Sequence, residues 1–159
     1  MKYYKRFESV GKYWLEQLSC YNEGPFQKKL ITKKGTSWSI GQLYHHLTNT
    51  TLDFQLKAID DCLLQQNGDI KGRKTFYGFF TFLLGKYFPT KQKIKNHHKI
   101  KPAQPDDIMM MRNASIRVLK SMNEYSDKIE KSSKEQLTYK VKHPYFGMLN
   151  AIEWYELVS

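Results

Sequence analysis

The stretch Trp38-Ser39-Ile40-Gly41-Gln42-Leu43-Tyr44-His45-His46-Leu47 decides the fold of this chain, because it opens the longest helical pattern in the sequence. Ser39 is placed to cap the helix, and Gln42 follows at the spacing of a capping box. The pattern then continues to about Gln66. Apolar and small side chains that recur every three or four residues form the expected buried seam of this helix. They are Leu43, Leu47, Thr50, Phe54, Ala58 and Cys62.

His46 lies beside this seam and is the candidate metal ligand of the helix. A histidine at the edge of a buried seam can meet groups from a neighbouring helix, and imidazole is the commonest metal ligand in proteins. His45 is turned about 100° further round the helix, toward solvent. A half-buried histidine that binds no metal is the more frequent arrangement, so both interpretations of His46 stay open.

The composition is that of a single folded domain, residues 1–159. Of the 159 residues, 40% are hydrophobic and 14% aromatic, which suffices for a proper core. No apolar run is long enough to span a membrane, and the first residues lack the apolar core of a signal peptide. Cys20 and Cys62 both fall in helical patterns and are expected to be reduced, buried thiols. We therefore expect a cytoplasmic protein without a membrane partner.

The chain is strongly basic. Its 26 Lys and Arg residues outnumber its 15 Asp and Glu residues, giving a net charge of +11. Such a surplus favours weak, salt-sensitive contact with polyanions. The surplus is almost all lysine, however, whereas direct readout of bases favours arginine. A solvated lysine-rich surface is the first expectation, and a nucleic-acid partner is not expected.

Further helices are predicted over residues 4–19, 75–87 and 105–131, and a last helix begins at 150. Pro105 suits a first helical position, and the carboxylates that follow it suit a first turn. The helix over 75–87 is apolar round most of its circumference, which predicts that it is mostly buried or lies at a subunit interface. Residues 136–141 are predicted to be a brief extended segment.

The start of the last helix is marked by several signals. Asn150 is a good N-cap, and Glu153 falls at the third helical position. Leu149 and Trp154 are spaced as a hydrophobic staple around this cap.

Residues 88–105 form the longest irregular stretch. Loops of this length are often functional, although a run of charges is usually no more than a solvated surface. The adjacent His97 and His98 do not converge easily on one ion. The lysines of this segment are Lys91, Lys93, Lys95, Lys99 and Lys101.

Two segments together resemble the DinB-like superfamily, which includes the YfiT-type metal-dependent hydrolases. The first is Ser37-Trp38-Ser39-Ile40-Gly41-Gln42-Leu43 followed by His46-Leu47. The second is His143-Pro144-Tyr145-Phe146-Gly147-Met148-Leu149 followed by Glu153-Trp154. The resemblance implies an all-α fold, a four-helix bundle with a long crossover connection, whose final helix is cut short in this chain. It also implies a homodimer.

The resemblance further implies a divalent metal, zinc or nickel, held by three histidines. His46 occupies the place of the first. The other two fall a few residues beyond the Glu153-Trp154 pair in the family, where this chain ends, so the metal site looks incomplete. A catalytic zinc needs about three protein ligands and an open position. The counterpart of His143 is structural in the family.

If the site were complete, its metal would lower the pKa of a bound water or thiol. Similar proteins are hydrolases or transferases that use a low-molecular-weight thiol, and residues 91–101 could attract such an anionic thiol. No catalytic residue is assigned.

The sequence leaves three functions open. The first is a metal-dependent enzyme of this family with an incomplete site. The second is a non-catalytic bundle that acts through binding or dimerisation, with residues 75–87 as its contact surface. The third is a basic nucleic-acid binder, suggested by the net charge alone.

Overall fold

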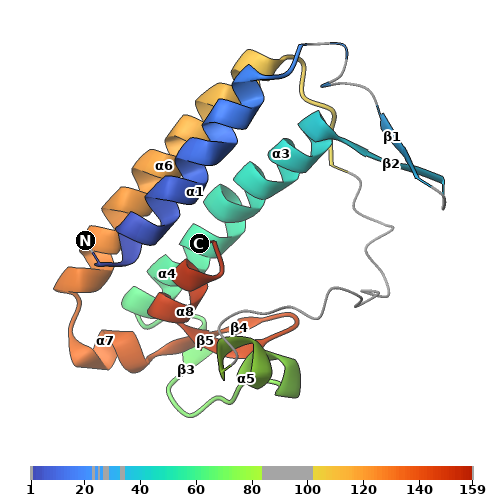
Figure 1. Ribbon diagram of the computed structural model, residues 1–159. Coiled ribbons are helices and arrows are strands. Elements are labelled where there is room, and N and C mark those ends of the chain that lie inside the picture. The colour runs from blue at the N-terminus through green and yellow to red at the C-terminus, as the bar shows by residue number, and fades with distance from the viewer. Residues whose placement is uncertain are drawn as a thin grey trace.

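The computed structural model describes residues 2–22, 24, 26, 29–32, 35–83 and 102–158. Long helical segments run side by side through this part of the chain, as Figure 1 shows, and the short helix α8 packs against the second of them. The fold is mostly helical, as predicted. The segments are α1 (Lys2–Ser19), then α3 (Ile40–Asn49), η1 (Thr50–Gln55) and α4 (Leu56–Leu63) in continuous succession, then α6 (Ile108–Lys131) and α8 (Ala151–Glu156).

The second helical segment begins as the sequence predicts. The Ser39 hydroxyl accepts the Gln42 N–H at 3.0 Å, and the Gln42 side-chain oxygen accepts the Ser39 N–H at 3.1 Å. The same two side chains reach the chain just before α6. The Gln42 amide donates to the Pro102 carbonyl at 2.9 Å, and the Ser39 hydroxyl donates to the Gln104 side chain at 2.6 Å. The capping box therefore also ties the start of α3 to the approach to α6.

The predicted seam of this helix is wrong over its first half. Leu43 and Phe54 are 45% and 42% exposed, whereas Tyr44, Thr48 and Thr51 are buried. Hydrogen bonds explain how these polar side chains become interior. The tyrosine hydroxyl donates to a backbone carbonyl of α1, and each threonine hydroxyl donates to a carbonyl one turn back in its own helix. With their polar atoms satisfied, these residues pack as apolar ones.

A π-helical turn, η1, interrupts the second helical segment. The Leu56 N–H donates to the carbonyl of Thr51, so this turn is wider than a turn of α-helix. Seams drawn at constant helical spacing do not hold across such a turn. Beyond it, Ala58 and Cys62 are buried as predicted.

Helix α6 begins later than predicted. Pro105 precedes the helix and is not its first residue, because the Asp107 side chain caps the helix by accepting the Met110 N–H. The apolar residues that this helix buries are Met111, Val118, Met122 and Ile129.

Helix α8 begins as predicted. The Asn150 side chain accepts the Glu153 N–H, and the Glu153 carboxylate accepts the Asn150 N–H, both at 3.0 Å. Leu149 and Trp154 flank this cap and are fully buried in the larger apolar cluster. The Tyr155 hydroxyl donates to a carbonyl of α6 at 3.0 Å, which fixes α8 against that helix.

The strands were mostly not predicted. β1 (Lys29–Thr32) pairs antiparallel with β2 (Gly35–Ser39). A second antiparallel sheet has the order β3-β4-β5, made of β3 (Gly68–Asp69), β4 (Lys140–His143) and β5 (Gly147–Asn150). The β4–β5 hairpin lies between α8 and α5 in Figure 1.

The segment before this hairpin is also a correction. Residues 136–141 were predicted to be extended. This is confirmed for residues 140 and 141, which begin β4, and wrong for residues 136–138, which belong to a short helix, α7 (Lys134–Thr138). A capping box between Ser133 and Gln136 favours this helix locally, and the Gln136 amide donates to the Leu63 carbonyl at 2.7 Å.

Helix α5 (Phe76–Leu83) exposes most of its large apolar residues, whereas the sequence predicted a helix that is mostly buried or lies at a subunit interface. Residues 84–87 of the predicted helix lie outside the described part of the chain. Gly78 and Thr81 are its buried residues, and the Cβ position of Gly78 lies against the hairpin turn, while Phe76 is 73% exposed and Leu83 is 63% exposed. Phe82 is the large residue of this helix that packs, partly buried, against the larger apolar cluster. The expectation of a mostly buried helix is therefore wrong within the described chain, and its alternative, a helix at a subunit interface, stays a prediction.

The two cysteines differ. Cys62 is buried, as predicted, and burial raises the pKa of its thiol to about 12. Cys20 is exposed, so that part of the prediction is wrong. Among the described helices, none is long and apolar enough to cross a membrane.

We expect Gly78→Ala to loosen α5 from the hairpin. A Cβ at this position would lie 2.1 Å from the Phe146 carbonyl oxygen, a contact that the backbone must move to relieve. We expect a loss of about 1–3 kcal/mol in chemical denaturation, and faster hydrogen exchange in α5 and the hairpin turn. Gly24→Ala is the control, since nothing lies within 4 Å of its Cβ position. Equal stability and exchange in the two variants would contradict the tight contact.

Candidate functional site

His46, the predicted metal ligand, lies half-buried on α3. Its ring meets the Trp38 ring edge to face, with centroids 5.1 Å apart, and its Nδ1 lies 3.4 Å from the Thr50 hydroxyl. His45 is half-buried as well, with its Nε2 3.4 Å from the Asn49 amide, so it is less solvent-facing than predicted. Both rings are therefore placed by neighbours on or next to their own helix.

The residues around His46 do not complete a metal site. Within the described ranges, no group of three His, Cys, Asp or Glu side chains gathers where an ion could be held. One imidazole is too few, because a catalytic zinc takes about three protein ligands. His97, His98 and the lysines of residues 91–101 lie outside the described residues. Metal binding stays a prediction.

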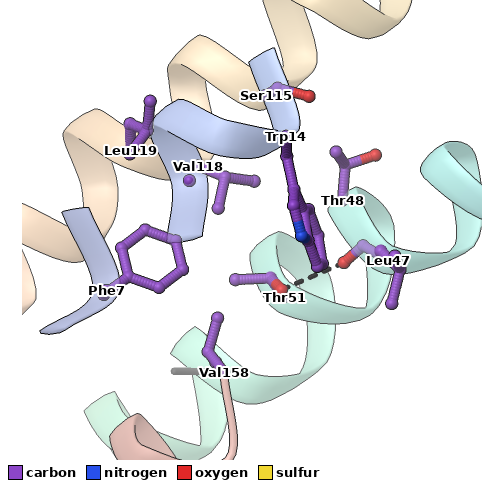
Figure 2. A pocket seen from close by; sticks show the side chains of 10 residues that line it. Phe7, Trp14, Leu47, Thr48, Thr51, Ser115, Val118, Leu119 and Val158 are labelled. Carbon is purple, nitrogen blue, oxygen red and sulfur yellow. Dashed lines mark hydrogen bonds between the residues drawn. The ribbon is translucent and has the colours of Figure 1, made fainter. Parts of the chain in front are cut away.

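The interior between α1, η1 and α6 holds a small cavity (Figure 2). Its volume is about 20 Å³, enough for roughly one water molecule. Its threonine hydroxyls are engaged with their own helix, and the dashed line in Figure 2 marks the bond from Thr51 to the Leu47 carbonyl. The Ser115 hydroxyl is buried and has no hydrogen-bond partner among the described residues. This cavity is too small to admit a substrate.

His143 organises the turn between β4 and β5. Its Nδ1 accepts the backbone N–H groups of Tyr145 and Phe146, at 3.1 and 3.2 Å. The ring stacks on Phe146 with centroids 4.5 Å apart and lies 4.9 Å from the ring of Trp154. Burial lowers the pKa of His143 to about 4, so the ring is neutral and serves as an acceptor. Its role here is structural, in agreement with the resemblance.

The exposed apolar side chains of α5 form one face, which we call the aromatic stripe. Its members are spaced at i, i+3, i+4 and i+7, which places them on one side of a helix. The rings touch one another, with centroids of Phe76 and Phe80 at 4.5 Å. The stripe consists of Phe76, Phe79, Phe80 and Leu83, which are 73%, 56%, 39% and 63% exposed.

A basic groove of about 430 Å³ adjoins the aromatic stripe. Lys71 and Arg73 are exposed along it. Lys74 is paired with Glu153 at 2.5 Å, and the Lys140 ammonium donates to the Gly72 carbonyl at 3.1 Å. The groove is lined by Lys71, Gly72, Arg73, Lys74, Thr75, Phe76, Phe79, Lys140 and Met148.

The groove carries a surplus of positive charge. Four cations line it, and the neighbouring carboxylates are Glu153, which binds Lys74, and Asp69, which accepts the Lys71 backbone N–H at 3.0 Å. Phe76 and Phe79 belong to both the groove and the aromatic stripe, so apolar and cationic surface are contiguous.

The sequence predicted the aromatic part of this surface but not its basic part. Residues 75–87 were predicted to be the contact surface in one interpretation, because the helix is apolar round most of its circumference. The sequence did not predict the cations of the groove, because Lys71, Arg73 and Lys74 lie in a polar segment of the kind that commonly connects two helices. Lys140 is distant in sequence and joins them only through the pairing of β3 with β4.

The described residues thus define a mostly helical protein with two small antiparallel sheets and an external basic and aromatic surface. No family model, curated protein or solved structure matches this chain. The likeness to the DinB-like superfamily stays a prediction.

We expect the folded state to lose stability as the pH falls from 6.5 toward 4. The unfolded chain protonates His143 near pH 6.5 and the folded chain near pH 4, so acid favours unfolding within this window. His143→Asn keeps an acceptor near the position of Nδ1 but cannot titrate. Its urea midpoint should therefore fall less between pH 7 and 4 than that of the wild type. His45→Asn is the control and should follow the wild type, and equal slopes for all three proteins would refute the assignment.

Proposed function

We propose that this protein is a non-catalytic binding protein, and that the aromatic stripe and the basic groove are its binding surface. The carrying observation is the exposure of the aromatic stripe of α5. Its four large apolar residues are exposed, while Gly78 and Thr81 are buried and Phe82 alone of the large residues of α5 packs against the core. A helix that packed for stability alone would place them the other way round.

The size of the exposed apolar surface supports this proposal. Each phenylalanine side chain has a surface of roughly 200 Å². At the exposed fractions given above, the three phenylalanines of the stripe together expose on the order of 300 Å² to solvent. Contiguous apolar patches of this size on a single protein often mark an interaction site. The interior cavity offers no competing site, because it holds about one water.

The charge of the groove indicates the sign of the partner. Lys71 and Arg73 are exposed, and the chain carries a net charge of +11. A second copy of this chain would bring two such grooves together if it docked on the same surface, and like charges repel. An anionic partner suits the groove better.

We expect Lys71→Glu/Arg73→Glu to weaken binding to fluorescein-labelled heparin about tenfold at low salt. The double substitution removes two cations of the groove that would contact the sulfate groups of heparin. The matched control is Lys57→Glu/Lys120→Glu, which reverses two exposed lysines elsewhere and changes the net charge equally. Anisotropy titrations across a salt series measure the affinities. If both pairs lose affinity equally, binding depends on overall charge and the groove is not the site.

A second candidate is a metal-dependent enzyme of the DinB-like type, either a hydrolase or a transferase that uses a low-molecular-weight thiol. Two observations favour it. The long connection between α4 and α6 suits a bundle with a crossover, and His46 lies half-buried just before a π-helical turn. Such turns occur frequently at functional sites. The donor set described above supplies one ligand, so no reaction step is assigned.

Metal content tests this second candidate. We expect about one divalent ion per chain by plasma mass spectrometry on purified protein, and its loss in His46→Ala, if His46 belongs to a complete site. His45→Ala is the matched control and should retain the ion. Absence of bound metal from the wild type after incubation with zinc or nickel would refute this candidate and leave the binding function unaffected.

A further inference from the structure

The geometry points to an anionic lipid bilayer as the partner of the binding surface. We propose that the aromatic stripe enters the membrane interface while the cations of the basic groove contact lipid headgroups. This inference rests on the proposed binding function and names its partner. It departs from the expectation of no membrane partner, because an interfacial contact requires an exposed apolar face with cations and not a spanning helix.

The aromatic stripe is presented by a firmly attached helix. The Thr75 hydroxyl donates to the Tyr145 carbonyl at 2.7 Å and accepts the Gly78 N–H at 3.1 Å. The Thr75 N–H donates to the Phe146 carbonyl at 2.9 Å. These bonds and the close approach of Gly78 hold one side of α5 on the hairpin, so the opposite side is held outward. A preorganised apolar face costs little entropy on binding.

The cations lie where headgroups would be. Phe76 and Phe79 line the groove and also belong to the stripe, so a bilayer that received these rings would meet Lys71 and Arg73 directly. Each basic residue held near an anionic membrane strengthens binding by about fivefold. Apolar insertion and charge thus act on the same face, which is the combination that interfacial helices use.

The packing of the stripe favours lipid over nucleic acid. Bases stack on separate, open ring faces. Here the rings of Phe76 and Phe80 are 4.5 Å apart and those of Phe79 and Phe80 are 5.7 Å apart, so the rings lie against each other. Leu83 extends the stripe and offers no ring. The result is a compact apolar wedge, which suits acyl chains.

Co-sedimentation of the full chain with vesicles tests this inference. We expect binding to phosphatidylcholine vesicles that contain about one-third phosphatidylserine, and at least tenfold weaker binding to phosphatidylcholine alone. Phe79→Ser/Leu83→Ser should lower the affinity at least tenfold, because two inserted apolar side chains are lost. Met109→Ser/Ile116→Ser is the matched control, since these α6 residues are 60% and 48% exposed. It should bind as the wild type does.

The cations are tested with the same vesicles. Lys71→Glu/Arg73→Glu should lose more affinity than Lys57→Glu/Lys120→Glu, which has the same net charge. A third reporter is Phe80→Trp. Its emission, after subtraction of the wild-type signal from Trp14, Trp38 and Trp154, should shift to the blue on the anionic vesicles and be quenched by brominated lipid. Circular dichroism checks that every variant is folded, and a variant that fails to fold is replaced by the Phe80→Trp measurement.

Each outcome decides between the two proposals. If heparin binding maps to the groove but vesicles do not bind, the lipid inference is wrong and the binding function stands. Stronger binding to a single-stranded oligonucleotide than to vesicles would also overturn the lipid inference. So would a dimer in solution that Phe79→Ser/Leu83→Ser converts to a monomer. If vesicles bind but the two charge-reversed pairs lose affinity equally and both serine pairs bind as the wild type does, overall charge explains the binding and both proposals fail.

Discussion

The turn between β4 and β5 is the constraint on which the arrangement of the binding surface depends. The His143 ring accepts two backbone N–H groups of this turn and packs on Trp154, which is fully buried. With the turn fixed, its carbonyls point at the start of α5 and receive the N–H and hydroxyl of Thr75. Gly78 then lies flat against the same turn, and the direction of every other α5 side chain follows.

Local signals in the sequence predicted where α3 and α8 begin. The capping boxes at Ser39 and Asn150 involve residues three positions apart, so a short stretch contains all the information. The seam after Ser39 was wrong because burial there belongs to Tyr44, Thr48 and Thr51, whose polar atoms are satisfied by backbone carbonyls. The hydropathy of these residues does not show that their hydroxyl groups will find hydrogen-bond acceptors in the interior.

The orientation of α5 lay beyond local signals. The side that faces the protein is chosen by contacts between Thr75 or Gly78 and a turn about 70 residues later in the chain. The pairing that brings Lys140 beside Lys71 and Arg73 is equally distant. The sequence therefore predicted a contact surface at the aromatic helix. It did not show which side chains of this helix face solvent, or that cations flank them. His46 illustrates the converse case, since its half-buried position was predicted while the described chain supplies no partner ligands for a metal.

The Glu153 carboxylate has two separate tasks. One oxygen receives the N–H of Asn150 and so helps to start α8, and the other binds the Lys74 ammonium at the edge of the groove. An amino-acid change at 153 would thus disturb a helix start and a surface cation together. Replacement by glutamine would keep the first contact and weaken the second, whereas loss of Lys74 would leave a partly buried carboxylate without its counter-charge. In the evolution of this protein, positions 74, 150 and 153 are consequently expected to change as a group.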